Sequence, residues 1–508
     1  MKKLIAIALL IFSTLFLWAD VIPKNYIKPS WQLPEIYSKV NISYLKGNYE
    51  LKFEEVTGEE KDGYKHVLRS KSDFIQSFCD YIALRNSTRS LFHYDTPNSY
   101  FDAKIAGYLD YRMVDEDGYF FGGWGMDIKA NIKNSILLET NWWKGHYLGD
   151  TVLAKSDYLV DSWYKSNDGK NDVSNIDNIT ASLTHYTENS LLTIGRGRYL
   201  IGNNISGSII LNNSSDDYGY YSMRFNAGDF AYSIMQGSMV PVLVDTLYYP
   251  DKRMVDKYVA LHQLEWRYKG LNLFLGEEIV YGNRSYDPNY MIPLGFWRIS
   301  EHLQWDRDNV LIFAGGSLKL KNTTLYGNLI LDELSKSKLF SNWWGNKWAV
   351  QGGISQQFVD FIGTTPRITV EVTVVRPWLY THKYYWNYFS HAEKTLGYEL
   401  GTNLINYALE LNLPLKEIGS LDINCAYTRQ GSYANDYTWD YGELIPVADS
   451  DDFETKLLAG KIVDTVRLES VFSFELLEHH FLKLSLINEF NLDADTKTTS
   501  SISYMTKF

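Results

Sequence analysis

The C-terminal half of the chain alternates apolar and polar residues in segments of about ten, and this pattern limits the possible folds most. Residues 367–374 read Arg-Ile-Thr-Val-Glu-Val-Thr-Val, so isoleucine or valine occupies every second position. Because the side chains of a strand point alternately to opposite faces, such a strand has one apolar and one polar face. Repeated many times behind a secretory signal, the pattern predicts a transmembrane β-barrel with lipid outside and polar groups inside.

Residues 1–19 have the pattern of a signal peptide. Lys2 and Lys3 give a positive start, an apolar stretch runs to Trp18, and Ala19 stands at the expected cleavage point. The stretch is short for a membrane helix of about 20 residues, and an uncleaved N-terminal anchor is the alternative interpretation. Residues 20–98 are predicted to form an N-terminal extension. It either lies in the periplasm or the lumen, or already contributes strands.

Residues 99–508 are predicted to form the barrel, because their connections fall into two alternating classes. Short turns are expected at 269–270, 321–322, 414–419 and 477–480, and long loops at 282–308, 333–346, 376–402 and 430–452. Outer-membrane barrels have short periplasmic turns and long extracellular loops. At roughly 22 residues for a strand and its connection, this region makes a large antiparallel all-β barrel of about 18 strands. Ser206–Asn212 is among the weaker candidate strands.

The overall charge of −12 argues against nucleic-acid binding, which requires a basic surface. The chain contains 39 Tyr and 15 Trp, whose rings suit the boundary between membrane and water. Cys79 and Cys425 match no metal spacing, and either form one disulfide or remain two separate thiols. The last strand, Ser500–Phe508, ends on an aromatic residue. It resembles the signal that the barrel-assembly machinery recognises, although Thr506 stands where an apolar residue is usual.

Several stretches of the chain resemble the capsule-assembly Wzi family of outer-membrane proteins, in the family's order. They are Tyr258–Trp266, Leu275–Gly282, Tyr290–Pro293, Asp308–Asn309, Tyr326–Glu333, Arg376–His382, Tyr388–His391, Leu396–Asn403 and, more weakly, Gly195–Tyr199 and Ser208–Asn212. The resemblance implies a large barrel in the outer membrane of a Gram-negative cell. It also implies a lectin-like role at the cell surface, in which capsular or other surface polysaccharide is held by binding and not by chemistry.

The two long loops 282–308 and 376–402 are rich in aromatic and arginine side chains. Sugar binding requires aromatic faces for the C–H surfaces and polar groups for the hydroxyls. The predicted polysaccharide-binding residues are Arg284, Tyr286, Tyr290, Trp297, Arg298, Trp305 and Arg307 in the first loop, and Trp378, Tyr385 and Trp386 in the second. The alternative for the aromatic residues is a membrane-interface girdle with loop packing. The arginines either contact acidic glycans or, as we favour, pair with neighbouring carboxylates.

Catalysis is not expected. The adjacent carboxylates Glu277 and Glu278, and those at 306, 308, 332 and 333, would suit a glycosidase only if two converged across a sugar. Carboxylates on inward strand faces are ordinary in barrels. Neither Glu478-His479-His480 nor His382 with His391 forms a metal-ligand set, so no metal or other cofactor is predicted.

The sequence therefore predicts a monomeric, non-enzymatic outer-membrane barrel whose partners are surface polysaccharide, outer-membrane lipid and the assembly machinery. A porin or substrate channel is the main alternative, and an outer-membrane enzyme is the third.

Overall fold

The computed structural model describes residues 92–96, 99–133, 135–150, 164–167, 173–187, 189–246, 249–305, 307–333, 336–338, 341–358, 364–392, 394–415, 419–437, 454–477, 480–492 and 496–507. The predicted signal peptide, nearly all of the predicted extension and Cys79 lie outside these residues. Cys425 is present as a free thiol.

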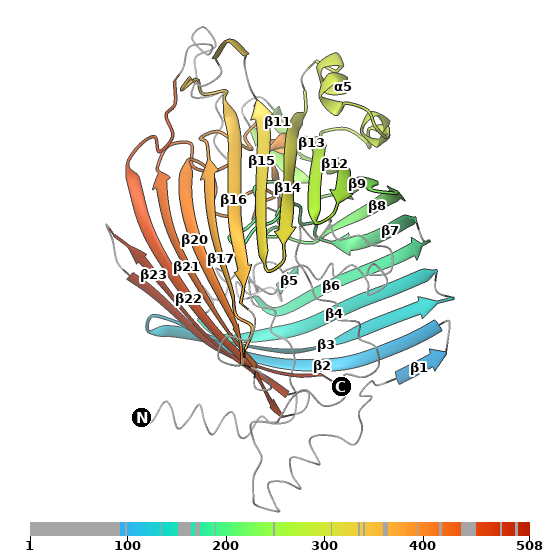
Figure 1. Ribbon diagram of the computed structural model, residues 1–508, viewed down its shortest axis with the longest axis vertical. Coiled ribbons are helices and arrows are strands. Elements are labelled where there is room, and N and C mark those ends of the chain that lie inside the picture. The colour runs from blue at the N-terminus through green and yellow to red at the C-terminus, as the bar shows by residue number, and fades with distance from the viewer. Residues whose placement is uncertain are drawn as a thin grey trace, which may run out of the picture.

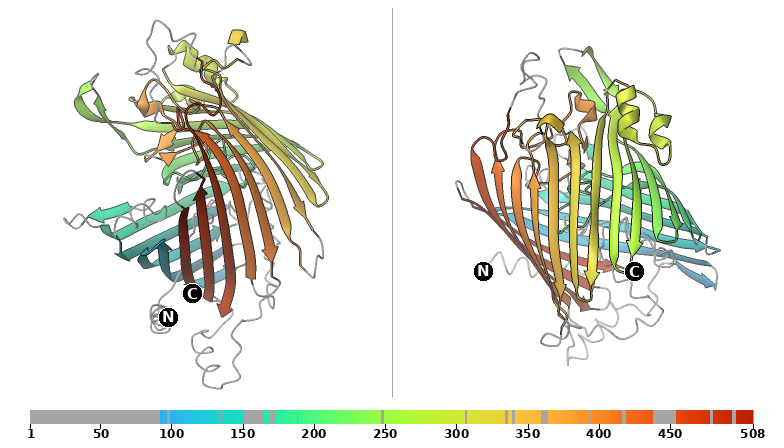
Figure 2. Two further views of the ribbon diagram at one scale, coloured as in Figure 1. Left: turned by 90° about the vertical axis from the view of Figure 1, so that its left-hand side faces the viewer. Right: turned by 45° about the horizontal axis from the view of Figure 1, so that its top comes forward.

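Eighteen antiparallel strands form a closed barrel (Figures 1 and 2). Each pairs with its neighbours in chain order, and pairing of β2 with β24 from Ala106 to Val114 closes the ring. The strands are β2 Ser99–Val114, β3 Asp117–Ile132, β4 Ile136–Gly149, β6 Val173–Tyr186, β7 Ser190–Gly197, β8 Tyr218–Ala227, β9 Phe230–Ser238, β12 Lys257–Tyr268, β13 Leu271–Gly282, β14 Asn309–Leu320, β15 Thr323–Glu333, β16 Lys347–Gln357, β17 Arg367–Val375, β20 Leu404–Pro414, β21 Gly419–Gly431, β22 Ile462–Leu477, β23 His480–Asn491 and β24 Thr496–Lys507. The predicted fold class is confirmed.

The remaining elements are short. They are β1 Phe92–Thr96 on the edge of β2, β5 Tyr164–Asn167 on β6, the hairpin β10 Val242–Thr246 with β11 Tyr249–Val255, the pair β18 Ser390–His391 and β19 Lys394–Thr395, the helix α5 Trp297–Leu303, and the 3-10 turns η2 Pro288–Met291, η3 Lys336–Lys338 and η4 Tyr385–Asn387. Because β1 pairs with β2, the sheet begins before residue 99. No helix among the described residues has the length and apolar character needed to cross a membrane.

The strands expose their apolar side and bury their polar side, the reverse of a water-soluble protein. On β17, Ile368, Val370 and Val372 are 37–44% exposed. Their neighbours Thr369, Glu371 and Thr373 are at most 2% exposed and face the interior. This is the pattern that a lipid solvent requires.

The long connections gather at one end of the barrel, which we call the outer end, as the predicted alternation requires (Figure 2). β2 and β23 also end there, at Val114 and Asn491, and each continues into a short connection. Residues 206–212 were expected to form a strand, and this prediction is wrong. They belong to the connection between β7 and β8, because the consecutive residues Ile209, Ile210 and Leu211 are all buried, whereas a strand of the wall alternates.

Candidate functional site

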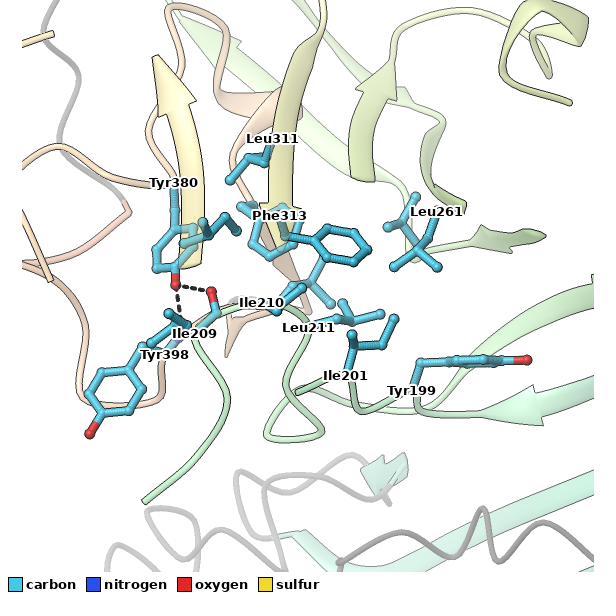
Figure 3. Packing of buried hydrophobic residues seen from close by; sticks show 14 of the residues in the cluster. Tyr199, Ile201, Ile209, Ile210, Leu211, Leu261, Leu311, Phe313, Tyr380 and Tyr398 are labelled. Atoms are coloured by element: carbon cyan, nitrogen blue, oxygen red, sulfur yellow. Dashed lines mark hydrogen bonds between the residues drawn. The ribbon is translucent and has the colours of Figure 1, made fainter. Parts of the chain in front are cut away.

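The connection between β7 and β8, residues 198–217, folds into the barrel, and we call it the inner loop. Ile201, Ile209 and Leu211 are almost completely buried (Figure 3). They pack in one cluster with inward-facing wall residues such as Leu311 and Phe313 of β14. The inner loop therefore narrows the lumen beside β14.

Polar groups of the wall hold the inner loop in place. The Glu371 carboxylate accepts hydrogen bonds from the backbone N–H groups of Ile205 (2.9 Å) and Ser206 (3.1 Å). Asn328 Nδ2 donates to the Asn203 carbonyl at 2.7 Å, and Gln351 Nε2 donates to the Gly207 carbonyl at 2.8 Å. A buried carboxylate that satisfies two backbone donors fixes the position of the loop strongly.

The connection between β17 and β20, residues 376–403, also turns inward, and we call it the rim loop. Tyr380 stacks on Phe389 with ring centroids 5.4 Å apart, and its hydroxyl donates to the carbonyl of Ile209 in the inner loop (Figure 3). Trp378 is fully buried, and its Nε1 donates to Thr455 Oγ1 at 3.1 Å. The inner loop and the rim loop therefore form one packed unit inside the outer end of the barrel.

His391 joins three long connections. Its Nδ1 accepts from the Val240 backbone N–H at 3.3 Å, and its Nε2 lies 3.4 Å from the Asp217 carbonyl, to which it can donate. Both contacts are satisfied by the neutral ring. Burial lowers the pKa of His391 to about 4.

Residues 283–308 follow a different course, and we call them the outer lid. They stand beside the upper ends of β12, β13 and β14, outside the barrel (Figure 1). Leu264 of β12 and Leu275 of β13 are exposed on the outer face of the wall. His262 and Glu277 lie on that same face, two residues nearer the outer end, and both are buried because the lid covers them.

The lid is fixed to the wall by an aromatic stack and by backbone hydrogen bonds. The Trp297 ring lies parallel to the His262 ring, with 4.1 Å between centroids. Glu277 accepts from His262 Nε2 at 2.8 Å and from the backbone N–H groups of Trp297 (2.7 Å) and Arg298 (3.2 Å). The same face contributes the apolar residues Ala260, Ile279 and Val310, and the lid covers them with Tyr290 and Trp297.

Charged residues of the lid pair with one another. Arg284 contacts both oxygens of Asp308, at 2.7 and 2.6 Å, and also reaches Asp287 at 3.1 Å. Burial lowers the pKa of Arg284, but the bonds to Asp308 outweigh this effect and raise it overall. Arg307 makes weaker contacts, 3.4 Å to Asp287 and 3.8 Å to Asp308. Of the two sequence interpretations, the internal charge network describes Arg284.

The lid and the rim loop meet at a junction on the strand ends. Asn387 Nδ2 donates to the Arg307 carbonyl at 2.6 Å, and Asn309 Nδ2 donates to the Asn387 carbonyl at 3.1 Å. The Lys257 ammonium, from the start of β12, donates to the Tyr388 carbonyl at 2.8 Å. Away from this junction, the aromatic residues of the lid pack on the outer face of the wall and Tyr380 of the rim loop packs inside it.

Aromatic side chains of the rim loop remain partly open to solvent near this junction. Tyr384 stacks on Trp386 with 4.9 Å between centroids and an angle of 6° between planes. Tyr385 lies edge-on to Trp386 at 5.4 Å, and Val255 of β11 packs behind them. Tyr384 and Tyr385 are half-buried, whereas Trp386 is 6% exposed. We call Tyr384, Tyr385 and Trp386 the rim aromatics.

The ten predicted binding residues thus differ widely in accessibility. Tyr290, Trp297, Trp378 and Trp386 are buried, Arg284, Tyr286, Arg298 and Tyr385 are half-buried, and Trp305 and Arg307 are exposed. A fully buried ring has no free face for a sugar while its loop keeps this conformation. Tyr384 was not among the predicted binding residues, although it belongs to the same aromatic run as Tyr385 and Trp386.

A polar cavity of about 350 Å³ lies beneath the inner loop, toward the short-turn end. Its wall residues are mainly amides and hydroxyls: Asn322, Thr324, Tyr326, Ser355, Gln357, Thr369 and Asn412, with Asn203 and Asn204 of the inner loop, the cations Lys319, Lys321 and Arg367, and the carboxylate Glu410. Within the described part of the chain, neither polar atom of the Asn203 amide has a hydrogen-bond partner. This cavity could not be predicted from the sequence, because it is formed by a loop that folds back onto the wall.

The adjacent carboxylates considered for catalysis do not converge where the structure describes them, and Asp306 lies outside the described residues. Glu277 and Glu278 are adjacent on β13, so they point to opposite faces of the wall. Asp332 is tied to the Tyr380 backbone N–H at 3.1 Å. Among the described residues, no three His, Cys, Asp or Glu side chains group closely enough to hold a metal ion.

Comparison with known proteins shows the fold. No family model and no curated relative match the chain. Among solved structures, the chain is similar to Wzi of Escherichia coli, an outer-membrane protein involved in group 1 capsule assembly and described as a carbohydrate-binding β-barrel. The match has 12% identity and a TM-score of 0.51, and covers 79% of this chain and 83% of Wzi.

Two further matches are to OpdK of Pseudomonas aeruginosa, solved with vanillate (10% identity, 80% of this chain and 98% of OpdK, TM-score 0.45), and OccAB4 of Acinetobacter baumannii (11%, 83% and 100%, 0.44). These identities establish likeness of fold alone. With its closed wall and exposed apolar belt, the chain is an outer-membrane β-barrel protein.

Proposed function

We propose that this barrel binds surface polysaccharide at its outer end and helps to hold it on the cell without catalysis, as a distant member of the Wzi family. The rim aromatics carry the proposal. Tyr384 and Tyr385 present half-open rings beside the barrel mouth, and the stack on Trp386 keeps them ordered. Rings that are ordered before binding lose little conformational freedom when a sugar stacks on them.

The packing behind these rings also supports binding. The rim loop is fixed by the Trp378–Thr455 and Tyr380–Ile209 hydrogen bonds, so its outer surface is held on a rigid base. A polar group that could donate to sugar hydroxyls lies nearby: Lys383 is exposed, and its Nζ is 5.3 Å from the centre of the Tyr384 ring. The likeness to the carbohydrate-binding barrel Wzi agrees with this function but gives no information on the glycan.

The double variant Tyr384→Ala, Tyr385→Ala tests the proposal. Loss of two stacking rings should weaken retention of the cell's polysaccharide by about thirtyfold, because each aromatic contact contributes roughly 1 kcal/mol. Retention is measured on whole cells, and binding on an array of bacterial polysaccharides with detergent-solubilised protein. Tyr268→Ala is the control, since Tyr268 is an exposed tyrosine at the opposite end of the barrel.

Normal retention in a double variant that assembles correctly would refute a rim site. Assembly is checked from the change in electrophoretic mobility that folded barrels show on heating. Trp386→Phe, which keeps a ring beneath Tyr384, should leave binding nearly intact.

The polar cavity favours a second candidate function, a channel for small polar solutes. Its amides and hydroxyls, with three cations against one carboxylate, suit a hydroxylated and negatively charged solute. Conductance in planar bilayers that falls on addition of glucuronate, and no longer does so after Arg367→Gln, would support the channel. Absence of conductance from the reconstituted protein would argue against it.

A further inference from the structure

The outer lid presents an apolar surface away from the barrel. Seven of its side chains are 40–91% exposed: Met291, Ile292, Leu294, Phe296, Ile299, Leu303 and Trp305. On α5, Trp297 and Glu301 are buried, whereas Ile299 and Leu303 are open. The lid is therefore apolar both where it contacts the wall and where it faces outward. Such a surface would be costly to hold in water.

This apolar surface continues the lipid-facing belt of the barrel. Leu264, Leu273 and Leu275 are 43–54% exposed on the same outer face, directly below the strand residues that the lid covers. The barrel lies in the outer membrane, so these leucines contact acyl chains. The lid extends the same surface toward the outer end of β12, β13 and β14 (Figure 1).

The polar groups beneath the lid are independent evidence that the lid lies at the level of the membrane lipids. His262, Glu277 and Gln236 lie on the outer face of the wall, where a membrane barrel normally has apolar residues. The lid pairs with each of them: its backbone donates to Glu277, the Trp297 ring covers His262, and Gln236 Nε2 donates to the Tyr290 carbonyl. If lipid reached this face, unpaired polar groups would cost several kcal/mol each.

We propose that the outer lid lies within the outer leaflet of the outer membrane, with its seven exposed apolar side chains in contact with lipid acyl chains. The lid separates the polar wall residues from lipid and anchors the outer end of the barrel. Arg298 is half-buried and Arg307 is exposed, and the charged ends of these long side chains can reach the polar boundary.

A glycan is a poorer occupant of this surface. Five of the seven exposed side chains are aliphatic and provide no ring face for a sugar, and none of the seven except Trp305 can donate a hydrogen bond from its side chain. This inference does not depend on the proposed polysaccharide function. It also gives Trp305 a lipid contact in place of the predicted sugar contact.

The test places a spin label at Leu303→Cys in the full chain, with Cys79 and Cys425 changed to serine. The protein is folded into vesicles of phosphatidylethanolamine and phosphatidylglycerol. Leu275→Cys is the control for the lipid-facing belt, and Asn289→Cys is the control for a polar lid position. Relaxation by oxygen should exceed relaxation by a water-soluble nickel chelate at Leu303 and Leu275, and the order should reverse at Asn289.

A Leu303 label that responds more to the nickel chelate, as at Asn289, would overturn the proposal. Protection of that label from the chelate only after polysaccharide is added would also overturn it, because the surface would then be a glycan site. Ile299→Cys on the preceding turn of α5 gives the same readout if Leu303→Cys assembles poorly. Each variant is used only after heat-modified mobility shows that its barrel has closed.

Discussion

The outer lid and the rim loop are two long, aromatic-rich connections at the same end of the barrel, yet they fold to opposite sides of the wall. The lid packs on the outer face of β12 and β13 through Trp297, and the rim loop packs inside through Tyr380. Both bury a tryptophan completely. Aromatic content therefore indicates that a loop is packed, but not which face of the barrel it covers.

The wall beneath each loop explains the difference. At the outer ends of β12 and β13 the outward positions include His262 and Glu277, which require polar partners and receive them from the lid. Near the rim loop the inward positions include Ala349 and Val375, which are apolar where a barrel interior is usually polar. Each loop covers the face on which the strand pattern is broken.

Replacement of the two buried tryptophans by alanine should separate the two loops, with the larger effect in the rim loop. Trp378→Ala removes a ring packed against Trp344 and the Trp378–Thr455 hydrogen bond, and should lower the free energy of unfolding by about 4 kcal/mol. Trp297→Ala should cost less, about 3 kcal/mol, because acyl chains can fill a space that opens toward lipid. Urea unfolding in lipid vesicles measures both.

A loss for Trp297→Ala as large as the loss for Trp378→Ala would contradict the proposed lipid contact of the lid. Leu275→Ala is the matched control for loss of lipid-facing volume without loss of the lid.

Lowering the pH should destabilise the inner loop and the rim loop before the outer lid. The pKa of His391 is lowered to about 4 by burial, whereas an exposed histidine titrates near 6.5. Between pH 6.5 and pH 4 the unfolded chain binds this proton and the folded chain does not. The contribution of neutral His391 to the free energy of unfolding is therefore fully present above pH 6.5 and is lost as the pH falls to 4. The loss amounts to about 3 kcal/mol. Protonation of Nδ1 also removes the acceptor for Val240 N–H.

Hydrogen exchange of the inner loop and rim loop between pH 7 and pH 4 measures this effect as a difference from His391→Gln. Glutamine can accept from Val240 and donate to Asp217 without titrating, so the variant corrects for carboxylates that protonate in the same range. If wild type and variant show the same pH dependence, His391 does not control the junction.

The sequence predicted the wall well, because lipid on one side and polar groups on the other impose a period of two on every strand. A short turn was expected at 269–270, and the structure has it there, between the end of β12 at Tyr268 and the start of β13 at Leu271. The inner loop was mistaken in part for a strand. A short apolar run such as Ile209–Leu211 does not reveal whether it lies in the wall or packs against it.

The candidate site was less predictable. The alternation of short turns and long loops predicted which residues belong to the outer lid and the rim loop. It did not predict which face of the wall each loop covers, because that depends on contacts between residues far apart in sequence. One signal was present: His262 interrupts the apolar face formed by Ala260 and Leu264. In a barrel, a polar residue on that face indicates that protein rather than lipid covers it.

The smallest expected effect concerns the arginines of the lid, for which the sequence left two interpretations. Arg307 is 45% exposed in its side chain. Its contacts with the carboxylates of Asp287 and Asp308 are long, and its one short hydrogen bond among those of the described residues is an exposed one to the Gln304 amide. Arg307→Gln should therefore change the free energy of unfolding by less than about 1 kcal/mol. Arg284→Gln removes a bidentate pair to the buried Asp308 and should cost about 2–3 kcal/mol. Urea unfolding of the two variants tests this order.

If Arg307→Gln instead weakens retention of an acidic polysaccharide while its stability is unchanged, the exposed arginine contacts the glycan and only Arg284 belongs to the internal network. If both variants lose stability equally, Arg307 stabilises the lid as much as Arg284 does, and the proposed difference between the two arginines is wrong.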